Sequence, residues 1–403
     1  MASAGRILFV TEKFPHPVDD GGQIRSFHVL ARLAAEFPVT LLSLAAPSSA
    51  DVDAIRRLDV EVVECGPRRA GWTVPWFAAE ALFTRAPYPM RKNFSRALLA
   101  EIRGRVAAGG VRAIHWNHLD AAQYLEHLRE ERERVRTVFD THNLLTRMYE
   151  RFASTAADPL RRAYTTLQWW RMSRFEPAIL RAVDQVVVCS DLERELVHTW
   201  GVKGARIVPN GVDVASFARA RGAARTAGAA PTIVFTGAFS YAPNAEGARW
   251  LLDAVRPELA KLLPRARIVL VGKDPSPALR ARARPGEIEV TGRVDDVRPY
   301  LGEADVCVVP LRVGGGTRIK ILEAMAAGVP VVSTRVGAEG IAARDGESIV
   351  LADDAAEFAR AVAELAGSPA RARAIATAAA ALVAERYDWS RVVEPLIDWY
   401  RDA

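Results

Sequence analysis

The sequence contains few cysteines and no long apolar run, and these two absences exclude several classes of protein. Its three cysteines, Cys65, Cys189 and Cys307, are odd in number and far apart, which argues against a disulfide framework and a metal cluster. No stretch approaches the roughly 18 uncharged apolar residues of a membrane-spanning helix. The first residues enter a predicted strand without a signal peptide's apolar segment. We therefore expect a cytoplasmic protein with buried, reduced thiols.

Signatures of other nucleotide- and metal-binding classes are also missing. No G-x-G-x-x-G follows the first predicted strand, which argues against a nicotinamide-dependent dehydrogenase, and no G-x-x-x-x-G-K-[ST] marks a P-loop. The pair Asp51 and Asp53 has Asp-x-Asp spacing, but we expect it in a polar, helix-capping loop, and we predict no metal site. Neither zinc-ligand spacing nor an RNA-binding aromatic signature occurs, so nucleic acid is not an expected partner.

What is present is the composition of a globular protein with two domains. The chain has 403 residues, half of them hydrophobic and a quarter charged, which is too long for one ordinary core. Short β-branched runs alternate with helical periodicity, which predicts parallel, doubly wound α/β sheets. The strands predicted before the middle of the chain are residues 6–10, 39–44, 60–65, 113–116, 137–140, 185–189 and 206–209. The helices predicted there include residues 23–36, 167–182 and 191–200.

A stretch rich in Ala, Arg and Gly at 218–230 predicts a surface linker. The alternation then restarts. The strands predicted after the linker are residues 232–236, 268–271, 288–291, 306–310, 329–333 and 348–351. The helices predicted there are residues 245–262, 355–365, 369–386 and 389–400. The chain therefore divides into two Rossmann-like halves.

Residues 313–334, VGGGTRIKILEAMAAGVPVVST, carry the most functional information. Glycines let a ligand approach the backbone, and a helix N-terminus attracts phosphate. Arg318 and Lys320 can add charge-assisted bonds to a diphosphate, and Glu323 can accept from sugar hydroxyls. The alternative is an ordinary βαβ crossover with a charged helix face. The grouping of anion, cation and acceptor sites favours a nucleotide-sugar site.

The stretch resembles the donor motif of the retaining family 4 glycosyltransferases with the GT-B fold. That motif reads Glu, seven residues, then Glu-Ala-Met-Ala-x-Gly-x-Pro-Val. Glu323 matches the second glutamate, and the matching residues that follow are Ala324, Met325, Ala326, Gly328, Pro330 and Val331. Gly315 occupies the position of the first glutamate, which touches the donor sugar in the family. The backbone amides of the loop would then hold the sugar, and this loop consists of Gly314, Gly315, Gly316 and Thr317. The variant is similar to bacterial exopolysaccharide and natural-product transferases with a Gly-Thr-Arg-x-Lys run.

The resemblance implies two Rossmann-like domains facing a cleft. The expected boundaries are 1–212 for the acceptor-side domain and 213–387 for the nucleotide-sugar domain, with a terminal helix, 388–403, packing back on the first. The run at 209–213, Pro-Asn-Gly-Val-Asp, matches the family's hinge region. We expect it to mark the boundary rather than the chemistry.

The family also suggests site residues in the first half. Gly21 and Gly22 precede a predicted helix, where the family's glycine loop faces the donor phosphates. His142 follows the strand predicted at 137–140, at the edge where α/β sheets bind ligands. In the family a histidine at such a place contacts the donor sugar, and we assign that role to His142. His115 and His118 are the alternative candidates.

In the second half, Gly237 ends the strand predicted at 232–236. The family often carries an arginine and a lysine just after it, but residues 239–247 read FSYAPNAEG and contain neither. The diphosphate charge would then fall to Lys320, one of six lysines in the chain, and Arg318. Arg293 and Val294 match the segment whose backbone meets the nucleobase, so the sequence does not identify the base.

A basic, aromatic segment remains unassigned. Residues 68–105 hold eight basic and two acidic side chains, an excess that equals the net charge of +6 of the whole chain. Between Trp72 and Arg96 this segment also carries six aromatic residues. One hypothesis is that it meets the inner face of a membrane or a lipid-linked acceptor. The alternative, which we favour, is an amphipathic helix with core aromatics and solvated arginines.

The leading functional hypothesis is a metal-independent retaining glycosyltransferase with a nucleoside-diphosphate sugar as donor, a hydroxyl-bearing acceptor and no cofactor. Lys320, Arg318 and His142 are its expected catalytic residues. Two alternatives stay open. The chain could be a catalytically silent GT-B subunit in polysaccharide assembly, or a nucleotide-sugar epimerase or hydrolase of the same fold.

Overall fold

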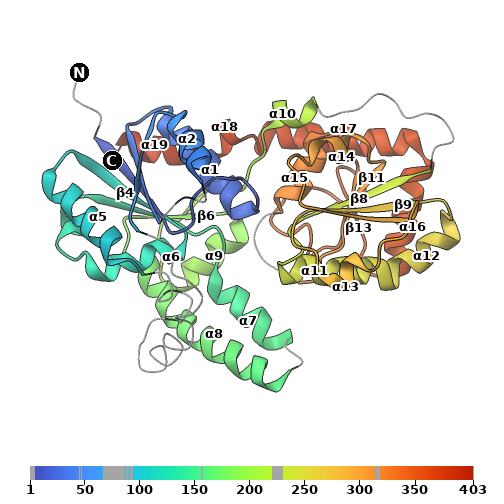
Figure 1. Cartoon of the computed structure of the whole chain (residues 1–403), viewed down its shortest axis with the longest axis horizontal. Coiled ribbons are helices and arrows are strands. Elements are labelled where there is room, and N and C mark those ends of the chain that lie inside the picture. Colours follow the sequence, from blue (N-terminus) through green and yellow to red (C-terminus); the bar gives the residue numbers. More distant parts are fainter. Residues whose placement is uncertain are drawn as a thin grey trace. The chain divides into compact units, whose positions relative to one another are not determined.

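The structure, a computed structural model, describes residues 5–44, 46, 48–66, 87, 90, 94–155, 158–219, 230–313 and 318–402. The chain forms two compact units (Figure 1). Unit 1 contains Met1–Pro209 and Val393–Ala403, and unit 2 contains Asn210–Val392. Each unit is built around one parallel β-sheet. The predicted α/β class with two parallel sheets is therefore confirmed.

The sheet of unit 1 has seven strands in the order β3-β2-β1-β4-β5-β6-β7. Their bounds are β1 Arg6–Thr11, β2 Val39–Ser43, β3 Val60–Glu64, β4 Val111–Asn117, β5 Arg136–Asp140, β6 Gln185–Val188 and β7 Arg206–Ile207. All seven predicted strands of this half are present. Because the strand order reverses between β1 and β4, the carboxyl ends of these two strands form the unit's topological switch point, where ligands bind in open α/β sheets.

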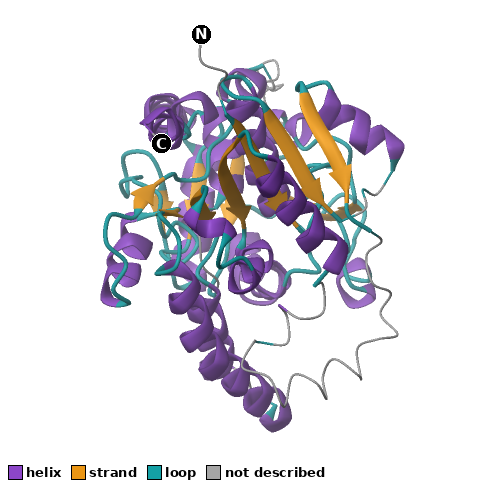
Figure 2. Ribbon diagram, turned by 90° about the vertical axis from the view of Figure 1, so that its left-hand side faces the viewer, coloured by secondary structure: helices purple, strands orange, loops and turns teal. Residues whose placement is uncertain are grey.

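Helices connect these strands, and one further helix of the unit, α19, comes from the end of the chain (Figure 2). They are α1 Gly21–Ala34, α2 Ser49–Arg56, α5 Arg96–Ala108, α6 Leu119–Ala122, α7 Leu145–Thr155, α8 Pro159–Leu180, α9 Asp191–Thr199 and α19 Glu394–Asp402, with short 3₁₀ turns η2 Gln123–His127 and η3 Glu131–Glu133.

The sheet of unit 2 has six strands in the order β10-β9-β8-β11-β12-β13. Their bounds are β8 Thr232–Thr236, β9 Arg267–Val271, β10 Ile288–Gly292, β11 Val306–Val309, β12 Val331–Ser333 and β13 Val350–Leu351. The helices are α10 Val214–Ala218, α11 Ala242–Trp250, α12 Arg256–Leu262, α13 Pro277–Arg280, α14 Arg298–Gly302, α15 Ile319–Ala326, α16 Ala355–Gly367, α17 Pro369–Arg386 and α18 Trp389–Val392, with a π-helical turn η4 Leu251–Val255. The switch point of this unit lies between β8 and β11.

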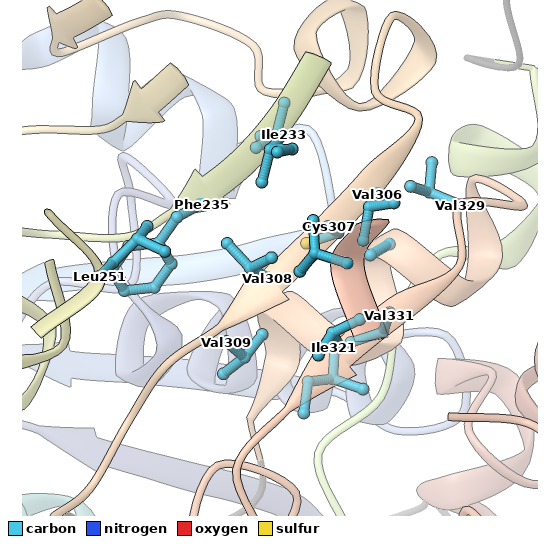
Figure 3. Close-up of a cluster of buried hydrophobic side chains, with 14 of the residues drawn as sticks. Ile233, Phe235, Leu251, Val306, Cys307, Val308, Val309, Ile321, Val329 and Val331 are labelled. Carbon is cyan, nitrogen blue, oxygen red and sulfur yellow. The ribbon is translucent and has the colours of Figure 1, made fainter. Parts of the chain in front are cut away.

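The core of unit 2 explains why its strands read as continuous apolar runs. Every residue of β11 is buried, as expected for a strand covered on both faces. Figure 3 shows Ile321 of α15 beside Val331 of β12, with Cys307 of β11 among the surrounding aliphatic side chains. This packing fixes α15, and with it the position of Lys320. All three cysteines of the chain are buried.

The C-terminal helix belongs to the first unit although it follows the second in sequence. Tyr400 of α19 is buried, and its hydroxyl lies 3.0 Å from Nδ1 of His115 on β4. Just before it, the backbone N–H of Val212 donates to the carbonyl of Tyr387 at 2.8 Å, so the outgoing and returning segments pair inside unit 2. The single helix predicted at 389–400 is wrong in detail, because Val393 separates α18 from α19.

Two further predictions are wrong. The helix expected at 245–262 begins at Ala242 and is interrupted by the π-helical turn η4. The Asp-x-Asp pair does not lie in a loop but within α2, where Asp51 is buried and its carboxylate contacts His16 at 2.6 Å. Ser48, not an aspartate, caps that helix.

Some predicted features lie outside the described residues. They include most of the linker at 218–230, the loop 314–317, and all the aromatics between Trp72 and Tyr88 in the basic segment. Within that segment Phe94 is described, and its ring stacks on Tyr124 at 5.0 Å. Arg105 pairs with Glu61 at 2.7 Å. These two residues therefore match the alternative of a core aromatic and a surface arginine. In the described part of the chain, no helix is long and apolar enough to cross a bilayer.

Candidate functional site

In unit 1 the structure brings His142 to the N-terminus of α1. This helix begins at Gly21, and Asp20 caps it by accepting from the backbone N–H of Gln23 at 3.0 Å. A Cβ on Gly22 would lie 3.8 Å from Nδ1 of His142. The two residues predicted from separate motifs are thus neighbours at the carboxyl edge of the sheet.

A hydrogen-bond network determines which nitrogen of His142 carries the proton. The hydroxyls of Thr11 and Ser26 each donate to a backbone carbonyl, at 2.9 and 2.7 Å. Both must therefore accept from the side-chain amide of Asn117, which lies 3.2 Å from Thr11 and 2.9 Å from Ser26. The Asn117 carbonyl oxygen then faces Nε2 of His142 at 2.8 Å, so Nε2 donates the hydrogen. Nδ1, on the side of Gly22, is left as an acceptor.

The surroundings keep this imidazole neutral. Burial lowers the pKa of His142 to about 3, although the nearby carboxylate of Asp140 opposes the shift. His142 also has a left-handed backbone, with φ of 54°, in a tight turn closed by the hydrogen bond from Asn143 N–H to the carbonyl of Thr141. Such strained conformations concentrate at functional sites.

Beneath His142 lies a buried ion pair that sequence analysis missed. Arg25 of α1 contacts Asp140, at the end of β5, with Nη2 to Oδ1 at 2.7 Å, and neither side chain is exposed beyond 1%. Burial alone would raise the pKa of Asp140, but the guanidinium lowers it. Arg25 also donates to the carbonyls of Val208 and Pro209, at 2.9 and 3.2 Å.

The alternative histidines occupy different environments. His115 is fully buried, stacks on Phe9 at 4.6 Å and meets Tyr400, so it joins the sheet to α19. His118 lies beside His142, with ring centroids 5.5 Å apart, and is only partly buried. Burial lowers the pKa of His118, but Asp120 and other nearby carboxylates together raise this pKa by more, so the net shift is upward. His118 therefore lies beside His142, and His142 stays the candidate for the sugar contact.

In unit 2 the site forms at the switch point. Nζ of Lys320, in the first turn of α15, lies 2.7 Å from the side-chain oxygen of Asn244 on α11 and 4.5 Å from the ring centroid of Phe235 on β8. The Asn244 amide nitrogen donates to the carbonyl of Ala238 at 2.8 Å, which directs its oxygen to the lysine. Asn244 thus fixes Lys320 between the two strands where the order reverses.

Gly237 must be a glycine for this arrangement to form. A Cβ at this position would lie 2.7 Å from Nζ of Lys320 and 2.8 Å from the amide nitrogen of Asn244. Gly272, at the end of β9, approaches the same backbone even more closely, since its Cβ would lie 2.0 Å from the carbonyl oxygen of Gly237. The ends of β8 and β9 therefore present bare backbone beside a cation, as close ligand approach requires.

Burial shifts both ionisable groups of α15 toward neutrality. It lowers the pKa of Lys320 to about 7, with a contribution from Arg318, and raises the pKa of Glu323 to about 7. Among the described residues, burial and the charge of Lys320 are the two causes that shift the pKa of Glu323, and they act in opposite directions. Arg318 occupies the N-cap position of α15 and is 9% exposed. An anion beside this cluster would favour the protonated forms of Lys320 and Glu323.

The other predicted donor contacts are only partly placed. Gly292 ends β10 in a left-handed conformation, with φ of 75°. Arg293 after it is exposed, whereas Val294 packs partly against the core. The loop 314–317, which contains four of the predicted donor contacts, lies outside the described residues. Among the residues that are described, no three His, Cys, Asp or Glu side chains could together hold a metal ion.

Sequence reasoning missed three residues that position the site: Arg25, Asn117 and Asn244. Asn117 could have been found, because it directly follows the strand predicted at 113–116, two positions after His115. Asn244 stands in the first turn of α11, where an amide can reach a neighbouring loop. Arg25 gave no signal, since arginines are abundant in this chain and its partner Asp140 lies 115 residues away.

Two family sequence models match the chain in succession. The model described as Glycosyltransferase Family 4 matches residues 20–216, and the model described as Glycosyl transferases group 1 matches residues 230–368. The first range contains the site of unit 1, and the second contains the site of unit 2.

Curated relatives match parts of the chain. A phosphatidyl-myo-inositol mannosyltransferase of Mycobacterium leprae is 32% identical over 233 residues, which are 55% of this chain and 61% of that protein. A D-inositol 3-phosphate glycosyltransferase of Saccharomonospora viridis is 31% identical over 250 residues, which are 57% of this chain and 58% of that protein. The chain therefore matches about three fifths of the length of these relatives.

Solved structures resemble the whole chain. A sucrose-phosphate synthase from Thermosynechococcus elongatus has a TM-score of 0.72 at 19% identity, with 99% of this chain and 98% of that chain covered. The Anabaena protein HepE, solved in complex with UDP and glucose, has a TM-score of 0.67 at 14% identity, with 99% and 100% covered. At these identities the likeness shows a shared fold.

Proposed function

Because the chain belongs to the group 1 and family 4 glycosyltransferases, whose two sequence models match its two halves, we propose that it transfers a sugar from a nucleoside diphosphate to an acceptor hydroxyl with retention at the anomeric carbon. One observation carries the proposal. The ammonium of Lys320 lies at the switch point of unit 2, held by Asn244 against the bare backbone of Gly237.

The diphosphate is the part of the donor that this site suits best. A helix N-terminus and a cation stabilise an anion together, and Arg318 and Lys320 both lie at the start of α15. The amides of residues 314–317 would complete the cradle. Arg293 and Val294 would carry the backbone that meets the base.

The sugar would be held by acceptor groups. His142 offers Nδ1 as an acceptor because Nε2 donates to Asn117, and its low pKa keeps it neutral at physiological pH. Glu323 can accept from sugar hydroxyls once it is ionised. Gly21 and Gly22 leave room for the donor at the start of α1.

The reaction breaks the bond between the anomeric carbon and the diphosphate oxygen, and it forms a bond from that carbon to the acceptor oxygen. The acceptor's proton passes to the departing phosphate, so no protein nucleophile or metal is assigned. Lys320 and Arg318 stabilise the negative charge that develops on the diphosphate, a contribution worth about a hundredfold or more in turnover per group. A glycan, glycolipid or natural product would supply the hydroxyl.

The first test is thermal unfolding with UDP, GDP, ADP and dTDP. We expect one nucleotide to raise the melting temperature of the wild type but not of Lys320→Ala. Lys261→Ala is the matched control, because Lys261 is an exposed lysine of the same unit that pairs with Glu258 at 2.8 Å. If no nucleotide stabilises the wild type, or if both variants lose the effect, the proposed donor site is wrong.

A catalytically silent binding subunit is the second candidate. Gly315 stands where the family has a glutamate, and residues 239–247 lack the family's basic pair. The two functions separate in an assay with the identified nucleotide's sugar donors and a panel of acceptors, among them inositol phosphates, which the relatives' names suggest. Nucleotide binding without transfer to any acceptor would favour the silent subunit, and donor consumption without acceptor would favour an epimerase or hydrolase.

A further inference from the structure

Helix α8 carries an exposed apolar face. In the described residues, eight large hydrophobic side chains are exposed, and four of them lie on this one helix. They are Leu160, Tyr164, Leu167 and Trp170, exposed by 82%, 46%, 36% and 52%. Their spacing of four, three and three residues places them on one side of the helix. We call these four residues the α8 face.

The α8 face lies on a part of unit 1 that projects from the sheet. Figures 1 and 2 both show the beginning of α8, together with the end of α7, extending away from the strands of the unit. The opposite side of α8 is occupied, since Thr165, Gln168, Met172 and Phe175 are buried. Unit 1 therefore does not require the α8 face for its own core.

The charge that α8 carries around the face is mainly positive, and the exposed Asp158 that caps the helix directly precedes the face. Residues 159–174 contain four arginines and no aspartate or glutamate. Arg161, Arg162 and Arg174 are exposed. The next acidic residue toward the C-terminus, Glu176, is buried and accepts from the backbone N–H groups of Leu145 and Thr146 at 2.9 and 2.7 Å. The partner of this face is therefore apolar in part and negative in part.

The aromatic and basic groups are arranged as at a membrane interface. The guanidinium of Arg174 lies 4.0 Å from the ring centroid of Trp170, a contact that gains strength when it is desolvated. Tryptophan and tyrosine prefer the headgroup region, and arginine can extend its charge to lipid phosphates while its stem remains among apolar groups. Helices that lie in the plane of a membrane surface carry groups of these two kinds.

We propose that the α8 face binds the surface of a bilayer that contains anionic lipids. A second copy of the chain fits the face less well. Pairing this face with itself would bring together three exposed arginines from each copy and only one exposed carboxylate of each α8 segment, that of Asp158, and like charges oppose such an interface. The inference stands on α8 alone and does not depend on the proposed sugar transfer.

Flotation of the full chain with vesicles tests the proposal. We expect binding at low salt to phosphatidylcholine vesicles that contain phosphatidylglycerol, at least tenfold stronger than to phosphatidylcholine alone, and weaker at high salt. The double variant Leu160→Ser, Trp170→Ser should lose at least tenfold in partitioning. Its control is Leu192→Ser, Leu262→Ser, which removes two other exposed leucines, 51% and 48% exposed, and should bind as the wild type does.

A second pair of variants isolates the charge. Arg161→Gln, Arg174→Gln should abolish the preference for anionic vesicles, whereas Arg335→Gln, Arg344→Gln, whose side chains are 67% and 81% exposed on unit 2, should keep it. Circular dichroism and melting temperature establish that each variant is folded. Absence of binding to anionic vesicles, equal losses in the control variants, or loss on Trp72→Ser, Trp76→Ser alone would overturn the proposal. So would a wild-type dimer that the first double variant dissociates.

Discussion

At the scale of single residues, Gly237 is a position where a substitution should affect ligand binding without preventing folding. Its missing side chain leaves room for the ends of Lys320 and Asn244, which are flexible enough to move if a methyl group intrudes. Gly272 differs, because a methyl group there would meet rigid backbone.

We expect Gly237→Ala to keep the fold and to weaken binding of the stabilising nucleotide by tenfold or more, because the added methyl displaces the ammonium. Calorimetric titration and thermal unfolding measure the two effects separately. Gly367→Ala is the control, since nothing lies within 4 Å of a Cβ there. Gly272→Ala should instead fail to fold stably. Wild-type affinity in Gly237→Ala would contradict the placement of the diphosphate.

The charge state of Lys320 leads to a prediction on pH. With a pKa of about 7 in the free protein, Lys320 is largely neutral at pH 8. A bound diphosphate favours its protonated form, so binding takes up a proton and affinity falls as the pH rises above 7. Glu323, with a pKa of about 7, acts in the same direction because its carboxylate repels the anion above that pH.

Titration of the nucleotide at pH 6.5 to 8.5, in two buffers of different ionisation enthalpy, measures this uptake (roughly one proton for a single titrating group). Lys320→Arg keeps its charge at every pH tested and should lose most of the dependence. A pH-independent affinity in the wild type would contradict the assignment of the diphosphate to Lys320.

The chemistry of single residues could be predicted only where a motif displays it. Lys320 and Glu323 stand in a recognisable run that the structure places in α15, and His142 stands in one that follows the end of β5. Asn117 and Asn244 were missed because their role depends on which way the side-chain amide points. That direction depends on the acceptors to which each amide donates. For Asn117 they are the hydroxyls of Thr11 and Ser26, which come from distant segments, and for Asn244 it is the carbonyl of Ala238.

At the scale of elements, the pair Arg25–Asp140 joins α1 to β5. Arg25 also joins α1 to the backbone carbonyls of Val208 and Pro209. Arg25 is 1% exposed and Asp140 is fully buried, so neither charge can be satisfied by water if its partner is removed. This pair therefore couples the helix that carries Gly22 to the turn that carries His142.

We expect Arg25→Leu to lower the free energy of unfolding of unit 1 by about 3–5 kcal/mol, the usual cost of leaving a buried charge unpaired. Urea unfolding at neutral pH measures it. Arg32→Leu on the same helix breaks only a half-exposed contact with Glu394 at 3.6 Å, so it should cost about 1 kcal/mol or less. The double variant Arg25→Leu, Asp140→Leu should recover part of the loss. Equal costs for the two single variants would contradict this account.

Elements were predicted more reliably than their ends. All 13 strands that the described residues form were expected from the sequence, and they occur in the two sheets. The helix expected from residue 167 begins at Pro159 instead, where Asp158 caps it by accepting from the backbone N–H of Arg161 at 2.7 Å. The π-helical turn after Trp250 could not be predicted, because its period is set by packing in the core of unit 2 rather than by local preference.

At the scale of the whole molecule, unit 1 is completed by residues from beyond unit 2. In α19, Leu396, Ile397 and Tyr400 are fully buried, and Arg401 pairs with Glu36 at 3.1 Å. The hydrophobic periodicity of residues 389–400 did not indicate that this segment is divided between the two units. The expectation of a returning helix came from the resemblance to a family.

We expect a chain that ends at Val392 to lose stability in unit 1 alone. Scanning calorimetry should show a lowered transition for unit 1, while the nucleotide still shifts the transition of unit 2. Tyr400→Phe, which removes only the hydroxyl facing His115, should cost about 1 kcal/mol. If truncation lowered both transitions equally and removed the nucleotide shift, the two units would not be independent.

The position of α19 has a consequence for biosynthesis. The ribosome makes β4 long before it makes Tyr400, so a nascent chain whose unit 2 has already emerged still exposes the face of β4 around His115. The two domains therefore cannot complete their folding in the order in which they are synthesised. The domain translated first is the last to close, and a stalled or prematurely released chain would present that uncovered surface to chaperones and proteases.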